Sequence, residues 1–307
     1  MADPQTGDPR RFLDPKVLAK ISRLDLVARL VVEGFVTGLH KSPYHGFSVE
    51  FAEHREYVPG DDIKHIDWKV FGRSDRYYIK QYEEETNLSA TILLDASESM
   101  KYRSPDHAAV SKLEYGCFIA ASLAFLILQQ RDTVGLVTFD EAIRKFVPPS
   151  SHPGHRNVIL QALHETDPVQ KTGLGKIFSE VAERAKRKGL IIVISDFFDD
   201  ATKILSGLRH LKYRRHEVMV FHVLDPTEKT FPFESMTTFK GLEGLDDVIA
   251  DPQALRRSYL EEMEAHIYEL KRGCRQDRID YLGLTTDQPL DLALSRYLAT
   301  RAEMKLT

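Results

Sequence analysis

The stretch ATILLDASESM, residues 90–100, places an apolar run directly before a carboxylate and two hydroxyls. The apolar residues 92–94 are typical of a strand that is buried on both faces of a sheet. Asp95, Ser97 and Ser99 follow at alternate positions, and alternate residues of extended chain point in the same direction. The stretch therefore predicts a central strand whose carboxyl end directs three oxygen-bearing side chains toward one point.

The chain after residue 88 repeats such apolar strands between helical patterns. Four further segments have the composition of strands: DTVGLVTFD, LIIVISD, EVMVFHVLD and DYLGLTTD. Alternation of apolar strands with helices predicts an α/β fold, doubly wound, with a mostly parallel sheet covered by helices on both faces. Functional groups of such sheets gather at the carboxyl ends of strands, where Asp95 and also Asp196 are expected.

Composition and charge restrict the function. The 307 residues include 42 Lys and Arg against 46 Asp and Glu, and the net charge of -4 gives no reason to expect nucleic acid. The first residues lack the apolar core of a signal peptide, and the longest apolar run, CFIAASLAFLILQQ, is too short to span a bilayer. We expect a cytoplasmic protein that does not insert into a membrane.

The N-terminal part differs in character from the rest. Residues 15–40 have the spacing of an amphipathic helix, and residues 41–88 are dense in charged and aromatic side chains. Their apolar content is too high for a solvated tether. We predict an N-terminal helical and charged, β-containing segment over residues 1–87, docked on a main domain over residues 88–307.

The alternating oxygens at residues 95–99 are suited to a hard cation. Mg²⁺ takes about six oxygen ligands at about 2.1 Å and usually keeps several waters. Hydroxyls are weak ligands, so such a site would bind loosely and stay open to a further carboxylate. The alternative is that Ser97 or Ser99 only caps the following segment, and the spacing alone does not decide between the two.

This order of residues resembles the metal-ion-dependent adhesion site of the von Willebrand factor A fold, in which Asp-x-Ser-x-Ser is followed by Thr and then Asp. The resemblance implies Mg²⁺ (or Mn²⁺ or Ca²⁺), direct ligation by the serines, and at least one aspartate acting through water. The implied ligands are Asp95, Ser97, Ser99, Thr172 and Asp196. Thr172 precedes a helical pattern, which its rival Thr166 does not. Many members of that fold family have Gly after the last Asp, where this chain has Phe197.

The resemblance extends to one bacterial family, catalogued as domain of unknown function 58. The segments REYVPGDD, HIDWK, KLE at 112–114, DTVGLVTF, LIIVISDFFDD and VFHVLDPTE follow that family in order. Its members typically lie beside MoxR-type AAA+ ATPases, which implies such an ATPase as partner and a client protein that the pair remodels or matures. Larger relatives often carry transmembrane helices, and this chain resembles the compact soluble type.

The expected function is a non-catalytic, metal-dependent protein-binding module, because no activated nucleophile and no paired acid and base is visible in the sequence. Two other hypotheses stay open at this point. The first is a metal-dependent hydrolase or nuclease that uses Asp61 or Asp62 with Asp67 and Lys69. The second is a scaffold with a vacant metal site.

The charged block before the metal motif also has a structural interpretation. Its ion pairs and its tryptophan would fasten this segment to the main domain without binding a ligand. The residues concerned are Arg55, Tyr57, Asp61, Asp62, Asp67, Trp68 and Lys69.

Overall fold

The structure is a computed structural model of the whole chain. It describes residues 24, 26–32, 54–56, 72, 77–80, 88–152, 154–167, 173–185, 188–239 and 248–305, without the side chains of 54–56, 78–80 and 301–305. Contacts within the chain divide it into two units, one of Met1–Gly38 with Leu88–Thr307 and the other of Leu39–Asn87.

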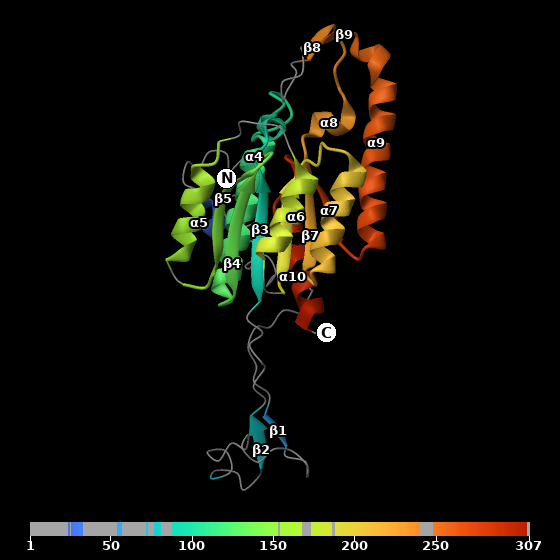
Figure 1. The fold of residues 1–307 in the computed structure, drawn as a ribbon. Helices are drawn as coiled ribbons and strands as arrows, with labels where there is room; N and C mark the ends of the chain where they lie inside the picture. Colours follow the sequence, from blue (N-terminus) through green and yellow to red (C-terminus); the bar gives the residue numbers. More distant parts are fainter. Residues whose placement is uncertain are drawn as a thin grey trace. The chain divides into compact units, whose positions relative to one another are not determined.

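The larger unit is built on a six-stranded sheet with the strand order β10-β7-β6-β3-β4-β5 (Figure 1). All neighbouring pairs are parallel except β4 and β5, which are antiparallel. The strands are β3 (Ser89–Asp95), β4 (Thr133–Phe139), β5 (Ile143–Ser150), β6 (Leu190–Ser195), β7 (Glu217–Leu224) and β10 (Asp280–Thr285). The predicted mostly parallel sheet is confirmed, and β5 adds an antiparallel edge strand to it.

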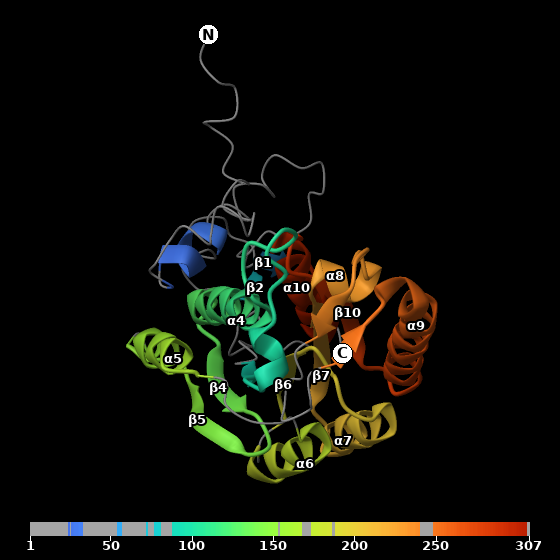
Figure 2. The same ribbon diagram turned by 90° about the horizontal axis from the view of Figure 1, so that it is seen from above.

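Helices cover both faces of this sheet, as predicted (Figure 2). One face carries α4 (Lys112–Gln129), α5 (His155–His164) and α10 (Asp291–Lys305). The other face carries α6 (Leu174–Arg184), α7 (Ala201–Tyr213) and α9 (Pro252–Gln276). A short helix α8 (Pro226–Thr230) and a two-stranded sheet of β8 (Thr237–Phe239) and β9 (Val248–Ala250) lie between β7 and α9 in the sequence.

The apolar run of β3 is buried because β4 and β6 flank it within the sheet and helices cover both faces of the sheet. Leu93 belongs to a core cluster with α6 and α7, while a Cβ built on Gly116 of α4 would lie 2.9 Å from Cδ1 of Leu94. Within the described part of the chain, α4 is the one helix long and apolar enough to cross a membrane by length and composition, and 67% of that window is buried.

The sheet changes its winding direction at β3. From β3 the chain passes through α4 to β4 on one side, and it later places β6 on the other side of β3. Leu94 pairs with Ile194 in register, so the carboxyl ends of β3 and β6 lie next to each other. In an open α/β sheet, the crevice at such a switch point is the usual place for a ligand.

The N-terminal part is described only in pieces. Residues 24 and 26–32 are helical, within the predicted helix 15–40, and Val27, Ala28 and Val31 are buried. In the smaller unit, β1 (His54–Glu56) pairs antiparallel with β2 (Tyr78–Lys80). The docking of this segment on the main domain stays a prediction.

Gly189, just before β6, is a position where the sheet requires glycine. A Cβ built there would lie 2.1 Å from the backbone oxygen of Ser89. Because that atom belongs to the backbone of β3, the two strands must move apart. We expect Gly189→Ala to lower the free energy of unfolding by about 1–3 kcal/mol, as overpacking does. Urea denaturation measures this.

Gly283 in β10 is the matched control, because a Cβ built there meets only the ring of Tyr281, at 3.8 Å. Gly283→Ala should leave the free energy of unfolding within about 0.5 kcal/mol of the wild type. Equal stabilities of the two variants would contradict the steric argument.

Candidate metal site

Asp95 is fully buried at the end of β3, and both of its carboxylate oxygens accept hydrogen bonds. Oδ1 accepts a hydrogen bond from the backbone N–H of Ser97 at 2.9 Å, and Oδ2 accepts one from the hydroxyl of Ser195 at 2.5 Å. Burial and, second, the charge of Asp196 raise the pKa of Asp95 to about 7, and the hydrogen bonds only partly oppose this. The carboxylate therefore sits where added positive charge would be stabilising.

The two serines of the motif lie side by side. Ser97 stands at the N-cap of the short helix η3 (Glu98–Lys101), but its side chain makes no capping hydrogen bond. Its hydroxyl instead lies 3.1 Å from that of Ser99, and both residues are buried. Adjacent ligands of an octahedral Mg²⁺ at about 2.1 Å are about 3.0 Å apart. The capping alternative for Ser97 is therefore wrong, and the oxygen spacing fits two neighbouring ligands.

Asp196 directly follows β6 and is also fully buried. The next residue, Phe197, has a φ of 54°, in the left-handed region that favours glycine. The neighbouring groups hold this conformation: Ser195 Oγ accepts from the N–H of Phe197 at 2.9 Å, and His266 Nε2 lies 2.9 Å from its carbonyl oxygen. Phe197 thus adopts the left-handed backbone conformation that Gly would adopt easily in the related pattern. Asp196 therefore stays at the carboxyl end of β6.

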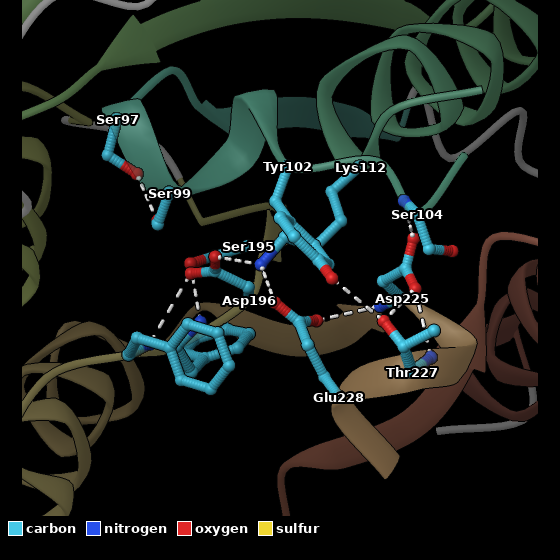
Figure 3. Close-up of polar contacts among 12 residues, drawn as sticks. Ser97, Ser99, Tyr102, Ser104, Lys112, Ser195, Asp196, Asp225, Thr227 and Glu228 are labelled. Atoms are coloured by element: carbon cyan, nitrogen blue, oxygen red, sulfur yellow. Dashed lines mark hydrogen bonds and ion pairs between the residues drawn. The ribbon is translucent and has the colours of Figure 1, made fainter. Parts of the chain in front are cut away.

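Lys112 introduces a cation that the motif did not predict. Its side chain is fully buried, and its Nζ lies 2.7 Å from Oδ2 of Asp196 and 2.6 Å from Oε1 of Glu228 on α8. Figure 3 shows the ammonium group between these two carboxylates. Burial alone would lower the pKa of Lys112, but Asp196 and Glu228 outweigh it and raise that pKa, so the ammonium is charged.

A second layer of hydrogen bonds fixes α8 beside this lysine. Asp225 accepts from the backbone N–H of Thr227 at 2.9 Å and from that of Ser104 at 2.9 Å. Its own N–H donates to Oε2 of Glu228 at 2.7 Å, which completes a capping box, and Tyr102 Oη lies 3.0 Å from Oγ1 of Thr227. The capping box of α8 therefore fixes the Glu228 carboxylate next to Lys112.

The threonine of the predicted ligand set is not settled. Thr172 lies outside the described residues, although the N–H of the next residue, Gly173, donates to the carbonyl oxygen of Asp140 just after β4. The rival Thr166 donates its hydroxyl to the carbonyl oxygen of Ala162 at 2.8 Å, at the end of α5. That bond occupies the donor of Thr166.

The donor set fits a loosely held hard cation. No group of three or more His, Cys, Asp and Glu side chains among the described residues is placed to hold a metal. The residues that would hold one are Asp95, Ser97, Ser99 and Asp196. A donor set of carboxylate and hydroxyl oxygens suits Mg²⁺ or Mn²⁺ with several waters retained, rather than Zn²⁺.

The charged block before the domain contributes little to this picture. Arg55 lies in β1, opposite Ile79 in β2. The other residues of that block, Tyr57, Asp61, Asp62, Asp67, Trp68 and Lys69, lie outside the described residues. The interface and hydrolase hypotheses for them stay predictions.

A mostly parallel α/β sheet with Asp-x-Ser-x-Ser at its switch point defines a von Willebrand factor A-like domain. The chain belongs to the family described as protein of unknown function DUF58, whose model matches residues 53–269. An uncharacterized protein of Mycobacterium tuberculosis is 26% identical over 296 residues, covering 94% of this chain and 90% of the relative.

Two solved structures are similar to part of this chain at low identity. BatB, a conserved hypothetical protein of Bacteroides thetaiotaomicron, is 16% identical with a TM-score of 0.48 over 70% of this chain and 99% of its own. The von Willebrand factor A domain of SpRpn10 is 13% identical with a TM-score of 0.38 over 68% and 94%.

Proposed function

We propose that this protein is a non-catalytic protein-binding module that works in the cytoplasm and depends on a divalent cation. The observation that carries the proposal is the pair of buried hydroxyls of Ser97 and Ser99, 3.1 Å apart, at the strand ends that also hold Asp95 and Asp196. Ser97 could have capped η3 with its side chain and does not. Its hydroxyl lies beside that of Ser99 instead.

The chain's own residues explain why the cation would serve binding. Asp95 and the two serines would hold it from one side, and Asp196 would act from the end of β6. Bound Mg²⁺ supplies uncompensated positive charge, which attracts an Asp or Glu of another protein. Because hydroxyls are neutral and the carboxylates are few, most of that charge is left for the partner.

The proposed partner is a MoxR-type AAA+ ATPase, and together the two proteins would remodel or mature a client protein. This part of the proposal is supported by membership of the DUF58 family, and the partner itself is the one that the sequence resemblance implies.

Removing one serine hydroxyl tests the proposal directly. We expect Ser97→Ala to weaken Mn²⁺ binding at least about tenfold in calorimetric titration of the full chain, because a ligand is lost. Capture of the MoxR-type ATPase from the native host should weaken in parallel and should be abolished by EDTA.

Ser179→Ala is the matched control, since it removes a serine hydroxyl that donates to the carbonyl oxygen of Gly175 within α6 and belongs to no candidate ligand. Its Mn²⁺ affinity should equal that of the wild type. A wild-type protein that binds no Mn²⁺, or that binds the ATPase equally well in EDTA, would refute a cation-dependent function and leave a plain docking scaffold.

A further inference from the structure

Lys112 occupies a position that helix formation does not favour. It is the first residue of α4, where the helix dipole is positive and a cation is destabilising. The helix end is already capped without it: the Ser111 side chain accepts from the N–H of Glu114, and the Glu114 side chain accepts from the N–H of Ser111. Neither the dipole nor the capping explains a lysine here.

Burial makes the position more costly still. The side chain of Lys112 has no exposed surface, and moving an ammonium out of water costs several kcal/mol. Two carboxylates and the ring of Phe198, whose centroid lies 4.6 Å from Nζ, compensate for that cost. An apolar side chain would fill the same space without needing any of them, so the charge of Lys112 calls for a role in the site.

That role follows from what the ammonium does to Asp196. Oδ2 of Asp196 is held at 2.7 Å by Lys112, while the one hydrogen bond to Oδ1 from the described residues is a long one of 3.4 Å from the N–H of Phe198. To ligate a metal directly through Oδ2, Asp196 would have to leave a cation that Glu228 and α8 hold in place. Oδ2 is thus bound to Lys112, and Oδ1 is left to accept a hydrogen bond from a water.

We propose that Lys112 is a positioning residue that keeps Asp196 out of direct contact with the cation. This inference rests on the proposed function and deepens it. With Asp196 already neutralised by an internal ammonium, the cation receives less negative charge from the protein. The remaining positive charge of the cation is then available to a carboxylate of the partner. Lys112 therefore lowers the affinity of the site for the metal and strengthens the attraction of the bound metal for the partner.

The test separates the release of Asp196 from a change in net charge. The double variant Lys112→Met with Glu228→Gln removes one positive and one negative charge, so the formal charge of the cluster is unchanged. Asp196 alone then loses its cation. We expect calorimetric titration of the full chain to show Mn²⁺ affinity about tenfold or more above the wild type, which is the size of effect that outer-shell partners have on metal sites.

Glu228→Gln alone is the companion variant, and the lysine stays. The ammonium then has Asp196 as its only carboxylate among the contacts described, and Mn²⁺ binding should weaken about threefold or more. Mn²⁺ affinity of this variant at or above the wild-type value would overturn the inference, and this measurement stands even if the double variant does not fold.

The outcomes distinguish this inference from the proposed function. Wild-type and double-variant proteins that bind Mn²⁺ equally would overturn the role of Lys112 and leave the cation-dependent function standing. Binding by the double variant but not by the wild type would support the role of Lys112 and refute the function. No binding by either protein would refute both.

Discussion

Lys112→Met is expected to lower the free energy of unfolding by about 3–5 kcal/mol in the presence of EDTA, the usual cost of removing one partner of a buried ion pair. The substitution keeps the length and apolar stem of the side chain but removes the ammonium. Asp196, fully buried, and Glu228, whose side chain is 12% exposed, are then left without their cation. Urea denaturation at neutral pH measures the loss.

The double variant with Glu228→Gln checks the cause of that loss. Glutamine can still accept from the N–H of Asp225, so the capping box of α8 is kept while one uncompensated charge is removed. The double variant should therefore recover part of the lost stability. A single variant within about 0.5 kcal/mol of the wild type would mean that water already solvates this cluster, contrary to its burial.

The sheet could be predicted from the sequence because its strands are apolar on both faces. β3 and β6 each contain a run of apolar residues that is closely followed by an acid, a pattern typical of strands buried in a parallel sheet. The same rule placed Asp95 and Asp196 at one edge, which the pairing of Leu94 with Ile194 confirms. The local alternation of Asp95, Ser97 and Ser99 likewise brought the two hydroxyls together.

The lysine and its partner were missed because they are joined only by tertiary structure. Lys112 and Glu228 are 116 residues apart, and each has an ordinary local interpretation, one at a helix start and the other in a capping box. The available signal was the sign of the charge, since a lysine in the first turn of a helix opposes the dipole. Ser195 was missed for a different reason: it is the last residue of β6 and reads as a strand residue, yet its hydroxyl bonds to Asp95.

Phe197 shows where a sequence pattern and a backbone requirement diverge. The related pattern often has Gly after the last Asp, where this chain has Phe197. The backbone nevertheless adopts a φ of 54°, held by the bond from its N–H to Ser195 Oγ and by burial of the ring against His222. Side-chain packing can thus replace glycine's freedom, which no pattern of residue types expresses.

Asp95→Asn is expected to stabilise the protein in EDTA, although it removes a residue of the proposed site. The pKa of Asp95 is raised to about 7, mainly by burial and next by Asp196, whereas in the unfolded chain it is near 3.8. A raised carboxyl pKa means that the native state binds the proton more tightly than the unfolded state. Stability of the wild type should therefore fall as pH rises from about 4 to 7 and stay low above that.

The size of the effect follows from the same shift. Because Asp95 is ionised in both the native and the unfolded state above pH 7, its raised native pKa corresponds there to a cost on the order of a few kcal/mol. Asparagine avoids that cost but donates poorly to Ser195 Oγ, which already accepts from Phe197, so we expect a net gain of about 1–3 kcal/mol at pH 8. Near pH 4 the two proteins should be almost equally stable.

Adding Mg²⁺ should reverse the order of stability, because a cation that binds only the native state stabilises it by mass action. The wild type is expected to gain stability with Mg²⁺ at pH 8, and Asp95→Asn is expected to gain none. Thermal unfolding at pH 4 and pH 8, with EDTA or with Mg²⁺, measures all four values for each protein. An Asp95→Asn protein that is less stable than the wild type in EDTA at pH 8 would contradict this prediction. It would show that Asp95 serves mainly to hold its loop, through the N–H of Ser97 and the hydroxyl of Ser195. Repulsion between the carboxylates of Asp95 and Asp196 would then not be large enough for a bound cation to relieve.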